Sequence, residues 1–124
     1  MDCIFCKIKN KELPSNILYE DDLVMVIMDV NPTVDGHSLI IPKKHYTDYL
    51  ELDNETLCHI FDVAREIAPK IMEKLEAKST TLLVNYGDDQ KVKHFHLHIL
   101  PDYLDNVKTG PKNTTKDNFQ ILSK

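Results

Sequence analysis

The feature that most constrains this chain is a stretch near residue 95 in which histidines alternate with apolar residues. The alternating positions are His94, Phe95, His96, Leu97, His98 and Ile99. A strand points successive side chains to opposite faces, so residues 92–100 are predicted to form a strand with the three imidazoles on one face. An unpartnered buried imidazole is costly, so core packing explains this pattern poorly. We therefore predict that the histidines form one functional cluster.

The spacing leaves two kinds of chemistry open for this cluster. A neutral imidazole can bind a metal ion, or it can attack an electrophile and form a covalent intermediate. A zinc site made of three histidines needs rings that converge at about 2.0–2.1 Å from the metal, and parallel neighbours on one strand converge poorly. The alternation alone does not choose between the two.

A second pattern indicates one long helix. From residue 53 to residue 75, apolar side chains recur at intervals of three and four, which is typical of an amphipathic helix. The apolar positions are Leu57, Ile60, Phe61, Ala64, Ile67, Ala68, Ile71 and Leu75. Asp53 is a suitable N-cap, and Pro69 predicts a bend.

The remaining apolar runs predict short strands bounded by turn residues. The predicted strands are residues 17–19, 23–28, 37–41 and 80–86, and residues 4–10 are predicted to form a short helix. This order predicts an α+β fold with antiparallel strands. After Pro101 the chain is polar, and its apolar patch at residues 119–122 is expected to dock on the domain or on a partner.

Composition limits the class of protein. A chain of 124 residues supports one hydrophobic core, and 42% hydrophobic with 28% charged residues is typical of a globular domain. The net charge of -5 argues against non-specific nucleic-acid binding, which depends on basic patches. No apolar run approaches the ~20 residues of a membrane span and no signal-peptide pattern begins the chain, so we expect a cytoplasmic protein without membrane contact.

The chain has three cysteines, which cannot all pair with one another. Cys3 and Cys6 have the Cys-x-x-Cys spacing, which in a reducing compartment favours metal or redox chemistry over a structural disulfide. Cys58 is interpreted as a core residue.

Several motifs, taken together, resemble one protein family. They are Cys3-Ile4-Phe5-Cys6-Lys7-Ile8, Tyr19-Glu20-Asp21, Asp29-Val30-Asn31-Pro32, Gly36-His37 through His45, Asn85-x-Gly87, and the His-x-His-x-His segment with the two apolar residues that follow it. On these motifs the chain resembles the histidine triad (HIT) superfamily of nucleotide hydrolases and transferases, closest to the bacterial Hint-like branch. The resemblance runs from about Cys3 to Pro101.

The resemblance implies a particular architecture. It implies a five-stranded antiparallel sheet with one long helix and a short N-terminal helix, paired into a ten-stranded sheet in a homodimer. The HIT-like catalytic domain would cover residues 1–104, and a polar tail of residues 105–124 would pack on the domain or on the dimer partner.

The resemblance also implies a reaction at the α-phosphorus of purine nucleoside monophosphate derivatives, such as phosphoramidates. His96 would be the nucleophile, and the nucleotidyl-histidine would then be hydrolysed by water or pass its nucleotide to an acceptor. Two in-line displacements keep the energetic demand of each step modest. His98 and His37 would contact the phosphate oxygens.

The nucleotide-binding residues follow from the same resemblance. Asp29 would accept hydrogen bonds from the ribose hydroxyls, and the Asn85 and Gln90 amides would donate to the phosphates. The apolar positions assigned to the nucleotide site are Ile4, Phe5, Ile8, Leu13, Ile27, Val30 and Leu39.

Relatives that carry the N-terminal cysteine pair bind zinc through two Cys and two His. Carried over to this chain, the ligands would be Cys3, Cys6, His45 and His94, and the site would be structural, with no position open to water. No organic cofactor is expected.

The chain departs from the family pattern on the leaving-group side. Residues 87–90 form a link two residues shorter than in most relatives, Lys91 stands where Ser or Thr is common, and Asp102 replaces a frequent Arg. Lys91 either offers a positive charge to the phosphates or is simply solvated.

Two alternative functions therefore stay open. One is hydrolysis of dinucleoside polyphosphates, which needs room for a second nucleoside. The other is a nucleotide-binding regulatory dimer with little turnover. The natural leaving group and the choice between adenine and guanine also stay open.

Overall fold

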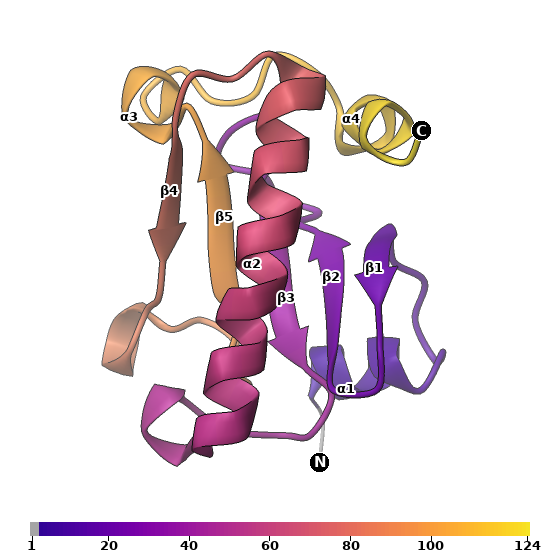
Figure 1. Ribbon diagram of the computed structural model, residues 1–124, viewed down its shortest axis with the longest axis vertical. Helices are drawn as coiled ribbons and strands as arrows, with labels where there is room; N and C mark the ends of the chain where they lie inside the picture. The colour runs from indigo at the N-terminus through magenta and orange to yellow at the C-terminus, as the bar shows by residue number, and fades with distance from the viewer. Residues whose placement is uncertain (1–2) are drawn as a thin grey trace.

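One antiparallel sheet forms the body of the molecule (Figure 1), and the computed structural model describes residues 3–124, so the first two residues of the predicted domain lie outside it. The five strands are β1 (Ile17–Glu20), β2 (Val24–Met28), β3 (Ser38–Pro42), β4 (Thr80–Leu83) and β5 (Leu97–Pro101). They lie in the order β1-β2-β3-β5-β4, and each neighbouring pair is antiparallel. The predicted α+β fold is therefore confirmed. No helix within residues 3–124 is long and apolar enough to span a membrane.

The helices lie on both faces of the sheet and beyond its ends. They are α1 (Ile4–Lys9), η1 (Tyr49–Glu51), α2 (Asn54–Leu75), η2 (Gly87–Asp89), α3 (Tyr103–Asn106) and α4 (Thr115–Leu122). The Asp53 side chain accepts a hydrogen bond from the Thr56 N–H, which confirms the predicted N-cap of α2. This helix continues through Pro69 as one element and crosses the sheet in front of the strands (Figure 1).

Both faces of the central strands are covered, but by different partners. On one face, Val26, Ile40 and Ile99 pack against α2. On the other face, Met25, Ile27 and Leu39 pack against Phe5 and Ile8 of α1. Burial on both faces explains why β2 and β3 are continuous apolar runs instead of alternating ones.

The structure shortens the histidine strand that the alternation predicts. The prediction began β5 at residue 92, but the strand begins at Leu97, so His94 and His96 precede it. The alternation of side chains nevertheless extends back to residue 94, since Phe95 lies in the α2-side core while both histidine rings contact Phe5 on the other face. The Phe95 N–H donates to the Tyr46 carbonyl at 2.7 Å instead of joining the sheet, which is why the strand begins later.

Three residues of α2 are more exposed than the sequence predicts. Cys58, interpreted as core, is exposed, because it lies about 200° around the helix from the buried Ile60. Leu57 and Phe61 keep 38% and 44% of their surface exposed, although both belong to the predicted apolar stripe. They point toward η1 and the segment after β4, where they border a second cavity.

The loop from residue 29 to residue 37 joins β2 to β3 at the end of the sheet where α4 lies (Figure 1). Gly36 has a φ of +80°, and a Cβ at this position would lie 2.4 Å from Leu75 Cδ1, so only glycine fits against the end of α2. Next to it, Leu122 of α4 is buried in the α2-side core with Phe119 packed against it. The apolar patch of the tail therefore docks on the domain, while the boundary at residue 104 stays a prediction.

Candidate active site and metal centre

The face of the sheet that α1 covers opens into a pocket of about 540 Å³. Apolar side chains from α1, β2 and β3 form part of its lining, and the rest comes from β5 and from the segments between α1 and β1, between β2 and β3, and between β4 and β5. The sequence-predicted residues in the lining are Ile4, Phe5, Ile8, Leu13, Ile27, Asp29, Val30, His37, Leu39, Asn85, His96 and His98. Positions far apart in the sequence are thus brought to one site.

His96 lies in this pocket, and a hydrogen bond to the backbone fixes the orientation of its ring. Its Nδ1–H donates to the His94 carbonyl at 2.9 Å, so Nε2 carries the free lone pair of the neutral ring. The Phe5 ring packs edge-on against the imidazole with 5.0 Å between ring centroids. Burial lowers the pKa of His96, which keeps the ring neutral and its lone pair available. The result is a buried, oriented nitrogen nucleophile.

His37 and His98 form a hydrogen-bonded relay beside His96. The Thr33 N–H donates to His37 Nδ1 at 3.0 Å, so the proton of this ring is on Nε2. That Nε2–H donates to His98 Nδ1 at 2.9 Å, and the proton of His98 is therefore on Nε2. The relay thus ends in an N–H donor. The nearby Asn85 Nδ2, at 3.4 Å, is also a donor, so these two groups do not hydrogen-bond to each other.

The same relay argues against a metal ion on His37 and His98. These two residues and Asp29 place one ligand atom each within 4.8 Å of one another. Metal binding through His37 Nε2 would move the ring proton to Nδ1, where it would face the Thr33 N–H that now donates to it. The relay is better suited to donate a proton or a hydrogen bond to an anion.

Burial keeps this histidine cluster uncharged. It lowers the pKa of His98 to about 3, helped by the charges that His96 and His37 would carry. It also lowers the pKa of His37, against the opposing effect of the Asp29 carboxylate, whose Oδ2 lies 3.5 Å from His37 Nε2. Near neutral pH, the rings act through directed N–H groups and lone pairs instead of net charge.

The predicted role of Gln90 as a donor to the phosphates is corrected, because the structure does not bring its side chain into the pocket. Its side chain is buried, and Nε2 donates to the carbonyls of Thr47 and Val92 at 2.6 and 3.0 Å. The side chain ties the shortened loop to the segment before η1 instead of facing phosphates. Asp102 also points elsewhere, since its Oδ1 accepts the N–H groups of Lys78 and Ser79.

Other lining residues were not assigned to the site from the sequence. They are Pro14, Ser15, Met28, Asn31, Thr33, Asp89 and Val92. Lys91, which stands where the family pattern has Ser or Thr, also lines the pocket. For Thr33 no sequence signal exists, because its contribution to the relay is a backbone N–H.

The four predicted metal ligands meet beneath the pocket. Cys3 Sγ lies 3.2 Å from His94 Nδ1, and Cys6 Sγ lies 3.4 Å from His45 Nδ1 and 3.5 Å from His94 Nδ1. The two imidazole Nδ1 atoms are 3.1 Å apart. Four ligands on one tetrahedral zinc ion, with bonds of about 2.0–2.3 Å, are separated by about 3.3–3.8 Å, so the cluster is close to that geometry.

The chemistry of the four donors also fits a metal. His94 Nε2–H donates to the Pro42 carbonyl at 2.8 Å, which leaves the Nδ1 lone pair facing the two sulfur atoms. Burial and the neighbouring Cys3 thiol raise the pKa of Cys6, against the opposing effect of the Lys9 charge. Two thiolates and two imidazoles are the ligands that zinc prefers.

Comparison with known proteins agrees with this architecture. The family model of the HIT domain matches residues 10–105. An uncharacterized HIT-like protein of Methanocaldococcus jannaschii is 38% identical over 103 residues, which cover 82% of this chain and 79% of that protein. An adenylylsulfatase of Arabidopsis thaliana is 41% identical over 102 residues, covering 81% of this chain and 52% of that protein.

Among solved structures, a zinc-bound histidine triad family protein of Mycobacterium smegmatis has a TM-score of 0.89 at 31% identity, with 99% of this chain and 91% of that chain covered. A histidine triad nucleotide-binding protein of Sulfolobus tokodaii has a TM-score of 0.83 at 32% identity, with 98% of this chain and 87% of that chain covered. The fold is therefore that of the HIT-domain hydrolases and nucleotide-binding proteins. The chain belongs to the histidine triad (HIT) family.

We expect His98 to stay neutral at pH 5. Its folded pKa of about 3 lies below the value of about 6.5 for an unperturbed ring, so the unfolded chain takes up this proton first as the pH falls. His98 therefore lowers the free energy of unfolding as the pH falls below about 6.5. The ring ¹⁵N shifts in a pH titration by NMR measure its charge directly. Protonation near pH 6 would contradict the burial argument.

Proposed function

We propose that this protein is a nucleotide hydrolase or nucleotidyl transferase that cleaves at the α-phosphorus of purine nucleoside monophosphate derivatives. The observation that carries the proposal is the buried His96 ring, whose Nδ1–H is bound by the His94 carbonyl and whose Nε2 lone pair is free in the pocket. An imidazole held in this way is prepared to attack phosphorus without first losing a proton.

The reaction would proceed in two displacements at phosphorus. His96 Nε2 forms a bond to the α-phosphorus while the bond to the leaving group breaks, which gives a nucleotidyl-His96 intermediate. The ring then carries positive charge, and the His94 carbonyl, which accepts its Nδ1–H at 2.9 Å, stabilises that charge. In the second displacement, water or another acceptor attacks the phosphorus, and the neutral ring is restored.

The relay of His37 and His98 would act on the oxygens bound to phosphorus. His98 Nε2–H is the donor at the end of the relay, and it can bond a phosphate oxygen or give its proton to the departing atom. Asn85, next to it, adds amide hydrogen bonding without adding a charge.

The nucleoside would lie between apolar and polar walls of the same pocket. The α1 side chains and the adjacent strand residues offer an apolar slot to the purine base. Asp29 Oδ1 accepts the Asn31 N–H at 2.8 Å, which orients the carboxylate so that it can receive the ribose hydroxyls.

A second candidate substrate class has an anionic leaving group. Lys91 lines the pocket, and one relative bears the name adenylylsulfatase, although that chain is about twice as long as the matched region. A lysine on the leaving-group side would favour departure of sulfate, or of a nucleotide from a dinucleoside polyphosphate, over a neutral amine.

We expect His96→Ala to lower turnover of adenosine phosphoramidate by about 10⁴-fold or more, because the nucleophile is lost. His59→Ala is the matched control, since His59 lies on α2 outside the lining of the pocket, and it should keep wild-type turnover. The measurement compares kcat/KM on adenosine phosphoramidate, diadenosine polyphosphate and adenylyl sulfate, with an alkaline denaturing quench to trap the acid-labile nucleotidyl-histidine adduct.

Full activity of the His96→Ala protein would overturn the covalent mechanism. Tight AMP binding by the wild-type protein without turnover of any of the three substrates would favour the regulatory, nucleotide-binding function instead.

We also propose that Cys3, Cys6, His45 and His94 hold a structural zinc ion. Four protein ligands complete a tetrahedral shell, so zinc bound there would supply a cross-link between the α1 segment and the residues leading into β5. A cytoplasmic location, which we propose as well, would keep the two thiols reduced.

We expect about one zinc ion per chain, and its loss in Cys3→Ser together with a lower melting temperature. Metal binding to a folded site is coupled to folding, so removal of one ligand costs stability as well as metal. Cys58→Ser is the matched control, because Cys58 is an exposed cysteine of α2. Elemental analysis and thermal melts measure both effects, and a metal-free wild-type protein would contradict the proposal.

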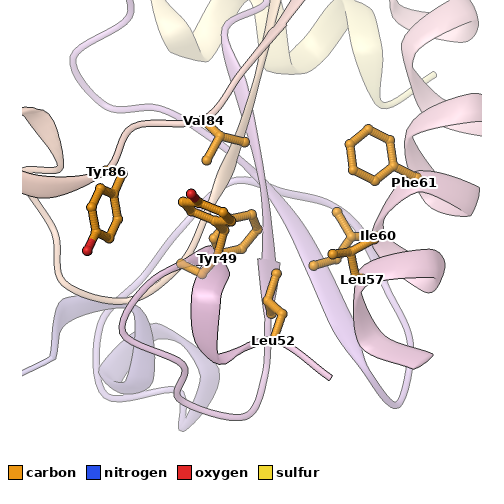
Figure 2. A pocket seen from close by; sticks show the side chains of 8 residues that line it. Tyr49, Leu52, Leu57, Ile60, Phe61, Val84 and Tyr86 are labelled. Atoms are coloured by element: carbon orange, nitrogen blue, oxygen red, sulfur yellow. The ribbon is translucent and has the colours of Figure 1, made fainter. Parts of the chain in front are cut away.

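The exposed apolar residues beside α2 support a homodimer, which we propose as the working assembly. Figure 2 shows Leu57, Ile60 and Phe61 of α2 on one side of a second cavity, with Val84 and Tyr86 on the other and Tyr49 between them. This cavity has a volume of about 350 Å³, and its lining is almost entirely apolar. β4 next to it is an edge strand, so pairing with β4 of a second copy would join two five-stranded sheets into ten strands.

We expect Phe61→Glu to convert the dimer to a monomer, because a carboxylate would be buried in an apolar interface. Leu104→Glu is the control: Leu104 is 82% exposed on α3, so a charge there should leave the assembly unchanged. Light scattering coupled to size exclusion measures the mass of each variant. A monomeric wild-type protein, or a dimer that persists in Phe61→Glu, would rule out this interface.

A further inference from the structure

The loop between β2 and β3, residues 29–37, carries two polar groups of the pocket, one at each end. Asp29 begins the loop and His37 ends it, and the Asp29 N–H donates to the His37 carbonyl at 3.0 Å. In between, the Thr33 N–H sets the tautomer of His37. The conformation of this loop therefore decides where the Asp29 carboxylate lies and which nitrogen of His37 faces the relay.

A half-buried carboxylate links this loop to the segment before α4. Asp35 accepts the backbone N–H groups of Lys112 and Asn113 at 3.1 and 2.9 Å, and the Asn118 Nδ2–H at 2.9 Å. Asn118 is 1% exposed, so its contact with Asp35 is shielded from solvent on one side, whereas the two backbone contacts lie at the surface. Burial alone would raise the pKa of Asp35, but these three donors outweigh it and the pKa is lowered, so the group is a carboxylate at neutral pH.

A second contact reaches the other end of the loop. The Thr115 hydroxyl donates to the Asp29 carbonyl at 3.1 Å, 86 residues away in sequence. Thr115 is the first residue of α4, and α4 is fixed on α2 by Leu122 and by the Lys74 Nζ that donates to the Leu122 carbonyl. The segment thus rests on a rigid element and touches the loop at two separate points.

We propose that residues 112–118 form a positioning element for the nucleotide site, with Asp35 and Thr115 as the positioning residues that hold the Asp29–His37 loop. The inference rests on the nucleotide-binding function proposed above, and it assigns the tail a part in substrate binding. None of residues 112–118 lines the pocket, so the segment acts through the loop and not on the substrate.

The two contacts are expected to affect binding more than chemistry. The Thr115 hydroxyl holds the peptide that follows Asp29, whereas His96 is held by a different segment through the His94 carbonyl. Loss of the hydroxyl should therefore misplace the carboxylate that receives the ribose while the nucleophile stays in place. Loss of the Asp35 carboxylate leaves three hydrogen-bond donors without their acceptor, so it should have a larger effect.

The test compares Thr115→Val, Thr115→Ser and Asp35→Ala in the full chain. We expect Thr115→Val to raise the AMP dissociation constant and the KM for adenosine phosphoramidate about fivefold, with kcat within about twofold of wild type. Thr115→Ser keeps the hydroxyl and should restore wild-type values. Asp35→Ala should raise both constants by about tenfold or more. Thr109→Val is the matched control, because the Thr109 hydroxyl donates to the Asn106 carbonyl within the tail and not to the loop.

Hydrogen exchange of the Asp29 and Thr33 amides gives a readout that needs no nucleotide. Both amides should exchange faster in Asp35→Ala and at the wild-type rate in Thr109→Val. The inference is overturned if exchange and AMP binding in Asp35→Ala and Thr115→Val match wild type while only the melting temperature falls. If the wild-type protein binds no AMP, the proposed function fails, and the exchange rates alone decide whether the segment holds the loop.

Discussion

The site depends on one residue, His94, which is bonded in three directions at once. Its Nε2–H donates to the Pro42 carbonyl at the end of β3, its Nδ1 faces the two cysteines and His45, and its own carbonyl accepts the Nδ1–H of His96. Each bond fixes a different unit: a strand, the N-terminal helix and the candidate nucleophile. A shift of this backbone would therefore change the cluster of two cysteines and two histidines and the direction of the His96 lone pair together. This cluster and the candidate active site are neighbours through a single peptide unit, so His94 anchors both.

The sequence is sufficient to predict much of this arrangement, for physical reasons that differ among elements. The alternation of histidine and apolar residues gives the correct faces from residue 94 onward, although the chain bends at residues 92–94 and only Leu97 onward joins the sheet. The N-cap Asp53 and the periodic stripe likewise give the start and extent of α2. Such predictions succeed because they need only local geometry.

The predictions that failed depended on packing between distant segments. Gln90 was assigned to the phosphates by its place in the motif, but the shortened loop turns its amide toward the Thr47 carbonyl. Cys58 is the exception: it was assigned to the core by its residue type, although the phase of its own helix places it outward. Thr33 contributes a backbone N–H, which no pattern of side chains in the sequence can predict. The contact between Asp35 and Asn118 could not be predicted from the sequence either, since 83 residues separate the two.

The division of the sheet into two unlike faces explains how so small a chain keeps both a core and a site. The face under α2 and α4 is closed by aliphatic side chains, so it supplies most of the hydrophobic stabilisation. On the opposite face, α1 is the one helix that packs on the sheet within residues 3–124, and this incomplete cover leaves the pocket open. A helix of six residues has little stability of its own, and so α1 needs further attachment to keep Phe5 against His96. Cys3 caps α1 and Cys6 lies within it, so a metal ion bound by this pair would provide the attachment where the apolar contacts are fewest.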